Sequence, residues 1–153
     1  MKPTMPKEAV VTAWVRLIRA QNTALSTVEA ALKCRGLPQL SWYDALLELD
    51  RVGDKGMRPF ELERALLLPQ YGLSRLLERI ERAGYIERRR CDEDGRGQVV
   101  AITAEGLAMR KRMWPILAAA IEEAVGARLT DREAEQLAEL LGKLIKERQS
   151  ESC

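Results

Sequence analysis

The sequence predicts a mainly α-helical protein with one small β-hairpin in its second half. Apolar residues recur at helical spacing from about residue 7 to residue 33, and again in the last segment after residue 130. Between residues 85 and 102 the pattern changes to two short strands around a run of turn residues. The chain has 153 residues, 46% of them hydrophobic, which is enough for a compact core with further helices attached to it.

The first half of the chain predicts three helices. The apolar positions of the first are Val10, Trp14, Leu17, Leu25, Val28 and Leu32. A soluble helix of this length rarely lies on one small core, so we expect it to pack against a partner chain as well. Ser41 is the expected N-cap of a second helix, with Asp44 three residues further on. Pro59 is placed at the first turn of a third, short helix that continues to Ala65.

A fourth helix is expected to open at Pro69 and to close at Gly84. One stripe of it is apolar and consists of Leu73, Leu76, Leu77 and Ile80. The other face and the first turn carry polar side chains, which are Gln70, Tyr71, Ser74, Arg75, Glu78, Arg79 and Arg82. Together with the short helix before it, this segment predicts a helix-turn-helix whose second helix reads bases in a DNA groove. The expected DNA contacts are Gln70, Tyr71, Ser74, Arg75 and Arg79. An ordinary amphipathic surface helix would show the same two faces.

The hairpin that follows is rich in arginine. Arg88, Arg89 and Arg90 lie along its first strand and Arg96 lies in its turn, close to Asp94. From residue 56 to residue 110 the chain has ten arginines and no lysine, although the net charge of the whole chain is only +2. Arginine holds phosphate or guanine in two-pronged geometry, which favours a nucleic-acid interface. The residues we expect to act at DNA in the hairpin are Arg88, Arg90, Asp94 and Arg96. A GC-rich genome would also favour arginine over lysine.

The order of these elements is that of a winged helix-turn-helix flanked by long dimerisation helices. Thr103 is the expected cap of a long fifth helix. Thr130 and Glu133 form a capping box before the last helix, whose apolar positions are Leu137, Leu140, Leu141, Leu144 and Ile145. We expect a DNA-binding domain over residues 36–103, dimerisation helices over residues 1–35 and 104–150, and a tail over residues 151–153.

Composition argues against several other classes of protein. The chain has no histidine, which removes the usual general base and nearly all zinc chemistry, so we expect no catalytic residues, no metal site and no cofactor. Its three cysteines are widely spaced and suit a reducing compartment. The sequence shows no signal-peptide pattern and no run of apolar residues long enough to span a bilayer. The expected location is therefore the cytoplasm.

The helix-turn-helix and wing resemble the MarR family of bacterial transcription regulators. The resemblance is carried by residues 66–86, by Asp92-Glu93-Asp94-Gly95-Arg96, and by Ile102-Thr103-Ala104-Glu105-Gly106, and it extends over nearly the whole chain. It implies a homodimer that places two recognition helices in successive major grooves of a pseudo-palindromic duplex. It also implies that Asp94 supports Arg96, and that Arg96 enters the minor groove. Regulators of this family commonly repress transcription and release DNA when a small aromatic ligand binds.

In the family, the ligand cleft lies where the first, second and fifth helices meet. Trp14, Trp42, Tyr43 and Trp114 lie on those helices and could stack on a planar ligand, or could be ordinary core or interface aromatics. Two alternatives to a ligand-released repressor remain. One is a winged-helix module that binds an acidic protein, and the other is a thiol-based redox sensor that uses Cys34 or Cys91.

Overall fold

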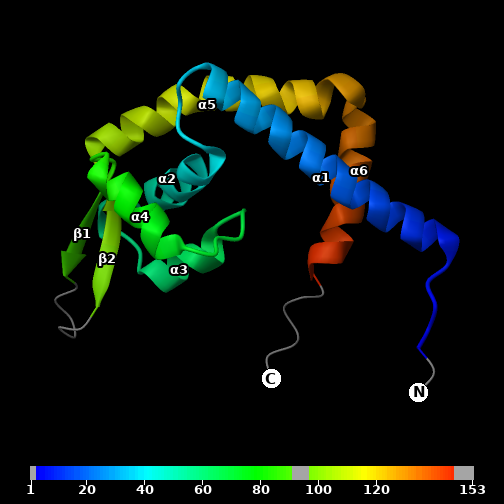
Figure 1. The fold of residues 1–153 in the computed structure, drawn as a ribbon, viewed down its shortest axis with the longest axis horizontal. Helices are drawn as coiled ribbons and strands as arrows, with labels where there is room; N and C mark the ends of the chain where they lie inside the picture. The colour runs from blue at the N-terminus through cyan, green and yellow to red at the C-terminus, as the bar shows by residue number, and fades with distance from the viewer. Residues whose placement is uncertain (1–2, 91–96, 147–153) are drawn as a thin grey trace. The chain divides into compact units, whose positions relative to one another are not determined.

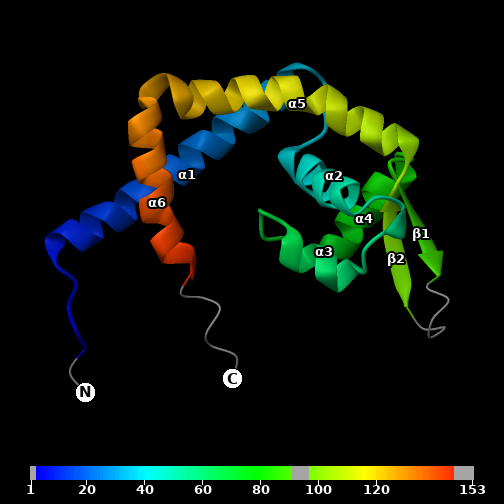
Figure 2. The same cartoon turned by 180° about the vertical axis from the view of Figure 1, so that it is seen from behind.

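The computed structural model describes residues 3–90 and 97–146, and shows helices interrupted by one hairpin (Figures 1 and 2). The helices and strands are α1 (Glu8–Cys34), α2 (Leu40–Val52), α3 (Pro59–Ala65), α4 (Leu73–Arg82), β1 (Ile86–Arg90), β2 (Gln98–Ile102), α5 (Ala104–Ala124) and α6 (Asp131–Lys146), with short 3-10 turns at Gly53–Lys55 and Gly126–Arg128. The mainly helical fold with a two-stranded hairpin expected from the sequence is therefore confirmed. None of the described helices is both long and apolar enough to cross a membrane.

The chain forms two compact units, and α1 and α5 each run through both. One unit is continuous in sequence, from Glu29 to Leu117, and contains α2, α3, α4 and the hairpin. The other combines the first 28 residues with the segment from Ala118 onward, and contains most of α1, the end of α5 and α6. The candidate DNA-binding elements thus all lie in the continuous unit.

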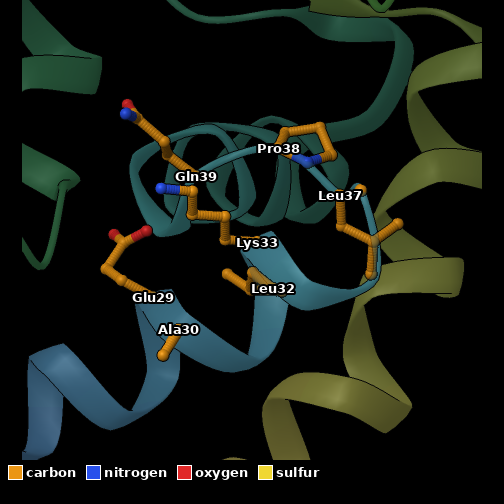
Figure 3. Close-up of a pocket in the computed structure, with 8 residues that line it drawn as sticks. Glu29, Ala30, Leu32, Lys33, Leu37, Pro38 and Gln39 are labelled. Atoms are coloured by element: carbon orange, nitrogen blue, oxygen red, sulfur yellow. The ribbon is translucent and has the colours of Figure 1, made fainter.

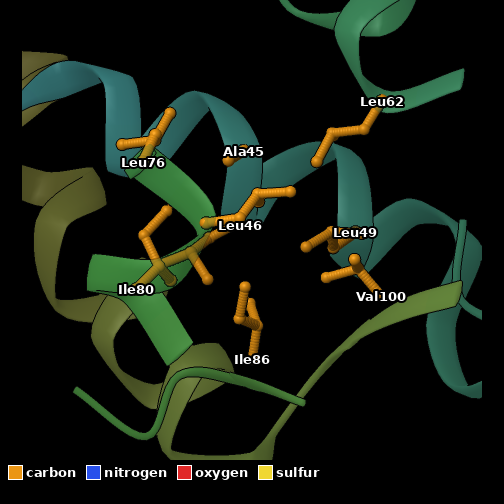
Figure 4. Packing of buried hydrophobic residues seen from close by; sticks show 9 residues of the cluster. Ala45, Leu46, Leu49, Leu62, Leu76, Ile80, Ile86 and Val100 are labelled. Atoms are coloured by element: carbon orange, nitrogen blue, oxygen red, sulfur yellow. The ribbon is translucent and has the colours of Figure 1, made fainter. Parts of the chain in front are cut away.

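The core of the continuous unit lies where α2, α3, α4 and the hairpin meet (Figure 4). Its buried members are Ala45, Leu46, Leu49, Leu62, Leu76, Leu77, Ile80, Ile86 and Val100. The apolar stripe predicted for α4 is confirmed, because Leu76, Leu77 and Ile80 are buried and Leu73 packs against the same cluster. Burying a leucine or isoleucine side chain contributes about 1.5–3 kcal/mol, so these contacts hold α4 firmly on the core.

The hairpin is antiparallel and is held to the rest of the unit by a third segment. Ile86 pairs with Ile102, and Arg90 pairs with Gln98 at the other end. Met57, in the connection between α2 and α3, forms an isolated bridge with Val100 through two backbone hydrogen bonds of 2.9 and 2.8 Å. Gly56 precedes it with φ +70°, and a β-carbon there would lie 2.8 Å from the carbonyl oxygen of Val100. Only glycine allows this close approach of the two backbones.

The start of α5 is locked to the end of the α4–β1 turn. The Thr103 hydroxyl donates a hydrogen bond of 2.6 Å to the carbonyl of Gly84 and accepts one of 3.1 Å from the amide of Gly106. The Thr103 amide also donates to the carbonyl of Tyr85 at 3.0 Å. Thr103 is therefore the helix cap that the sequence predicted, and it also joins α5 to the base of the hairpin. Gly84 has φ +85°, as expected for the residue that closes this turn.

Two helix starts differ from the sequence prediction. The N-cap of α2 is Gln39, and the predicted cap Ser41 lies inside the helix. The amide of Leu40 is satisfied by Glu29 of α1, whose Oε1 accepts its hydrogen bond at 3.2 Å. A carboxylate eleven residues upstream thus supplies the acceptor that a local serine was expected to supply. The second difference concerns α4, which begins at Leu73 and leaves Pro69 in the turn before it.

In the other unit, the last helix begins as predicted. The Thr130 amide donates to Glu133 Oε2 at 2.9 Å, and the Glu133 amide donates to the Thr130 hydroxyl at 3.3 Å, which is a capping box. Hydrogen bonds from the Thr130 amide and hydroxyl hold the pKa of the Glu133 carboxyl below its usual value. This unit also exposes large apolar side chains on α1 and α6, which include Val10, Trp14, Leu137, Leu140, Leu144 and Ile145.

Candidate nucleic-acid interface

Helix α4 presents a polar, arginine-rich face opposite its buried stripe. Arg75, Glu78, Arg79 and Arg82 are all exposed, while the leucines behind them are buried. Because the apolar side is fixed in the core, the exposed side is held at a defined orientation rather than on a mobile segment. The predicted division of this helix into a buried apolar face and an exposed polar face is thus found in the structure.

A surface groove of about 560 Å³ collects four of the five residues predicted to contact DNA from the recognition helix. It is lined by Gln70, Tyr71, Gly72, Arg75, Leu76, Glu78, Arg79 and Arg82. Gln70 and Tyr71 lie in the turn before α4 and not in its first turn, and Tyr71 is fully exposed. Ser74 is exposed on α4 but does not line this groove. The groove combines guanidinium, amide and phenol groups, which are donors suited to phosphates and base edges.

The turn between α3 and α4 is tied to α2 by a buried carboxylate. Asp44 Oδ1 accepts a hydrogen bond of 3.1 Å from the amide of Leu67, and its Oδ2 accepts one of 2.9 Å from the amide of Leu68. Only 5% of Asp44 is exposed. The sequence pattern suggested Asp44 only as a partner of the Ser41 cap, and the signal that was missed is an acidic residue within an otherwise apolar helix segment.

The arginines of β1 are not equivalent. Arg88 Nε lies 3.4 Å from Glu81 Oε2, so this side chain pairs with α4. Arg89 donates to the backbone carbonyl of Asp54 at 2.7 Å and forms an ion pair with Glu87 on its own strand. Alternation along the strand separates Arg89 from its two neighbours, which follow Ile86 on one side of the hairpin.

Arg90 lies at the end of β1 nearest the turn and is exposed. Asp94 and Arg96, predicted to act together in the wing, lie outside the described residues. At the first described residue after the turn, a β-carbon on Gly97 would lie 3.5 Å from the Arg58 guanidinium. Arg58 is thus a further cation beside the hairpin, and one that was not among the predicted DNA contacts.

The aromatic residues proposed for a ligand cleft make different ring contacts. Tyr43 and Trp114 stack with ring centres 6.2 Å apart and planes 19° apart. Trp42 instead meets Tyr85 edge to face at 6.1 Å and 71°. Trp14 belongs to the other compact unit, where it is 63% exposed and lines a small pocket with Pro6, Val10 and Val11.

Two further pockets lie at the connection between α1 and α2. One, of about 640 Å³, is lined by Glu29, Ala30, Leu32, Lys33, Gly36, Leu37, Pro38 and Gln39 (Figure 3). The second, of about 440 Å³, is lined by Gly36, Leu37, Pro38, Gln39, Trp42, Arg79, Ala83, Tyr85 and Met109. The second pocket contains the Trp42–Tyr85 pair, an arginine and a methionine, so it offers both apolar and cationic contacts. Among residues 3–90 and 97–146, no three potential metal-ligating side chains converge on one site.

Comparison with known proteins identifies similar regulators. A family model described as "MarR family" matches residues 35–97. An HTH-type transcriptional regulator from Bacillus cereus is 29% identical over 133 residues, which cover 87% of this chain and 86% of that protein. A MarR family transcriptional regulator from Streptomyces coelicolor, solved in complex with DNA, has a TM-score of 0.86 and 25% identity, covering 98% of this chain and 95% of its own.

The same fold occurs in a mutant of Escherichia coli MarR complexed with operator DNA. Its TM-score is 0.77 at 22% identity, and the match covers 92% of this chain and 99% of the other.

Proposed function

Because the chain belongs to the MarR family of transcriptional regulators, we propose that it binds a pseudo-palindromic duplex DNA site as a homodimer and represses transcription there. The observation that carries the proposal is the groove along α4, where Gln70, Tyr71, Arg75 and Arg79 gather on a helix anchored by its opposite face. The two similar structures solved with DNA support it.

Within this interface, the proposed roles divide by position. Arg75 lies near the start of α4 and would contact base edges, together with Gln70 and Tyr71 in the preceding turn and Ser74 beside it. Arg79 lies one turn further along and would bind the phosphate backbone.

The hairpin would contact the neighbouring minor groove. Arg90 is exposed at the end of β1 nearest the turn. Arg88 pairs with Glu81, so it would contact phosphate only if that ion pair opened or if it bound both groups at once. We assign minor-groove entry to Arg96, oriented by Asp94 through a two-pronged ion pair, as the family resemblance implies.

The proposed dimer rests on the apolar side chains that α1 and α6 leave exposed. Trp14, Leu140 and Ile145 are 63%, 59% and 71% exposed in the single chain. Exposed apolar side chains repeated along two helices are typical of surfaces that a partner covers. A second copy of the chain would bury them and bring two α4 helices to one duplex.

For a releasing ligand, the structure favours a different group of residues from the one proposed from sequence. Trp42 lines the pocket of about 440 Å³ with Tyr85, Met109 and Arg79, whereas Tyr43 and Trp114 are occupied with each other. We therefore place a small aromatic ligand at Trp42 rather than among all four aromatics. Aromatic side chains with a few polar groups are the usual lining of such sites.

The test is selection from a pool of random duplexes by the purified chain, followed by a salt titration on the selected sequence. We expect a single enriched sequence with two-fold symmetry, and log affinity that falls linearly and steeply with log salt because phosphate contacts release counterions. No enrichment would contradict the DNA-binding proposal and would favour the alternative of a protein-binding module. Sedimentation of the free chain at micromolar concentration as a monomer would contradict the dimer.

A further inference from the structure

We propose that Asp44 is a positioning residue for DNA recognition, which fixes the turn before α4 and thereby the side chains that meet base edges. The inference rests on the proposed DNA-binding function and adds a residue that does not itself reach DNA. Asp44 is 95% shielded from solvent and lies on α2, so any effect it has on recognition must act through the backbone that it holds.

The geometry of the contact is two-pronged. The two carboxylate oxygens accept hydrogen bonds from the amides of two successive residues, Leu67 at 3.1 Å and Leu68 at 2.9 Å. Successive amides that point to one carboxylate define both the position and the direction of the chain at that point. Hydrogen bonds that involve an ionised acceptor are also roughly twice as strong as neutral ones.

Leu66 packs against the core and Leu68 is half-buried, so side chains hold the turn in part, and Asp44 adds two hydrogen bonds to its backbone. Leu67 is 79% exposed and Tyr71 is fully exposed, so neither side chain packs the turn against the core. Helix α3 ends at Ala65, and the Leu66 amide closes it by donating to Leu62. The next two amides in the chain are those that Asp44 binds.

The hydrogen bonds from Leu67 and Leu68 to Asp44 fix the segment that leads into the groove along α4. Gln70 follows Leu68 by two residues, and α4 begins at Leu73. With the turn held at one end by Asp44 and at the other by the buried face of α4, Gln70 and Tyr71 have a defined place in the groove beside Arg75. Release of the first end would let these two side chains sample other positions, and contacts to bases need a fixed geometry.

An aspartate is required by this arrangement because both oxygens must accept. In Asp44→Asn, the amide oxygen can still accept from one backbone amide, but the NH₂ group then faces the other donor. That amide loses its acceptor in a part-buried position, which costs free energy because a polar group is left unsatisfied. The change keeps the volume of the side chain, so the fold should persist.

The test compares Asp44→Asn with Asp50→Asn, in the full-length protein. Asp50 lies on the same helix, and its Oδ2 is 2.7 Å from Arg110 Nε, so the control removes an acid of α2 that does not contact the turn. The first measurement, made without DNA, is the hydrogen-exchange rate of the Leu67 and Leu68 amides. We expect at least one of them to exchange about tenfold faster in Asp44→Asn, and neither to change in Asp50→Asn.

The second measurement is affinity for the duplex selected by the parent chain and for random duplex of the same length. We expect Asp44→Asn to weaken binding to the selected duplex about tenfold, as for one lost base contact, and to change binding to random DNA by less than about twofold. Equal losses of affinity on both duplexes would overturn the positioning role. So would an unchanged ratio of selected-duplex to random-duplex affinity in a variant whose amides exchange faster.

Unchanged exchange would overturn the tether itself. If the parent chain selects no sequence, the DNA-binding proposal fails and the recognition role of Asp44 fails with it, whereas the exchange measurement still decides whether Asp44 holds the turn. A fall in unfolding temperature shared by Asp44→Asn and Asp50→Asn, with equal losses of DNA affinity, would count as general destabilisation and contradict the inference.

Discussion

Replacement of Gly106 by alanine should destabilise the protein by driving the start of α5 away from the hairpin. A β-carbon at this position would lie 2.0 Å from the carbonyl oxygen of Tyr85, and also 2.9 Å from Ile102 Cγ1. Relief of the first contact to 3.0 Å requires a displacement of about 1 Å. The Tyr85 oxygen is backbone, so no flexible side chain can yield.

That displacement would stretch the bonds that join α5 to the α4–β1 turn. The Thr103 hydroxyl bond to Gly84 is 2.6 Å long and the Thr103 amide bond to Tyr85 is 3.0 Å, so an extra ångström takes both beyond hydrogen-bonding range. Each such bond contributes about 1 kcal/mol, and overpacking of this kind costs about 1–3 kcal/mol. Alanine is about 1 kcal/mol more favourable than glycine inside a helix, which leaves a net loss of about 2–4 kcal/mol.

The assay is equilibrium unfolding in urea, and the matched control is Gly142→Ala. Gly142 also lies inside a helix, α6, but a β-carbon there meets no other atom within 4 Å, so the control should gain up to about 1 kcal/mol. Both variants are measured at two protein concentrations, so that a change in association is recognised separately. If Gly106→Ala is as stable as the parent protein, the explanation of this glycine by steric contact is wrong.

Three further predictions concern the candidate interface and the last helix. Arg75→Ala should cost about 1–3 kcal/mol of affinity for the selected duplex and much less for random DNA, whereas equal losses would reassign Arg75 to phosphate contact. Arg96→Ala and Asp94→Ala should each weaken DNA binding, with less than additive losses in the double variant, because Asp94 then has no arginine to orient. Tighter binding by Asp94→Ala would refute the supporting role. Because its pKa is lowered from 4.5 in the folded chain, Glu133 stabilises the fold above the pKa of the unfolded chain and loses this effect as pH falls through the folded pKa. The stability advantage of the parent over Glu133→Gln should therefore shrink below about pH 4.5 in urea unfolding, and an advantage independent of pH would contradict the capping-box explanation.

The parts of the fold that could be predicted from sequence are those set by local periodicity. The buried stripe of α4, the two strands and the capping box at Thr130 are each specified by residues within a few positions of one another. The start of α2 and the turn between α3 and α4 depend on distant partners. Glu29 satisfies the first turn of α2 from eleven residues away, and Asp44 binds a turn more than twenty residues downstream. A pattern of neighbouring residues cannot predict contacts between residues so far apart in the sequence.

The candidate site shows the same division. Spacing along a helix was enough to select Arg75 and Arg79, which the structure places in one groove with Gln70 and Tyr71. On β1 the sequence favoured Arg88 and Arg90 over Arg89, but it could not show their partners, because the partner of Arg88 lies on α4 and one partner of Arg89 lies before α3. The ring contacts of Trp42 with Tyr85 and of Tyr43 with Trp114 could not be predicted either, since such contacts depend on packing between elements rather than on composition.

The bridge between Met57 and Val100 has a consequence for how α4 could be moved to another protein. It closes the chain into a long loop that contains α3, α4, β1 and the first part of β2, and the entropy of closing that loop must be overcome before its long-range contacts form. Contacts that are distant in sequence also slow folding, so α4 should acquire its protection late and together with the hairpin. A peptide that carries only α3 and α4 lacks both the bridge and the strand that supplies Val100 to the core. The portable unit of this protein is therefore the closed loop together with α2, and a graft of the two helices alone should remain unfolded.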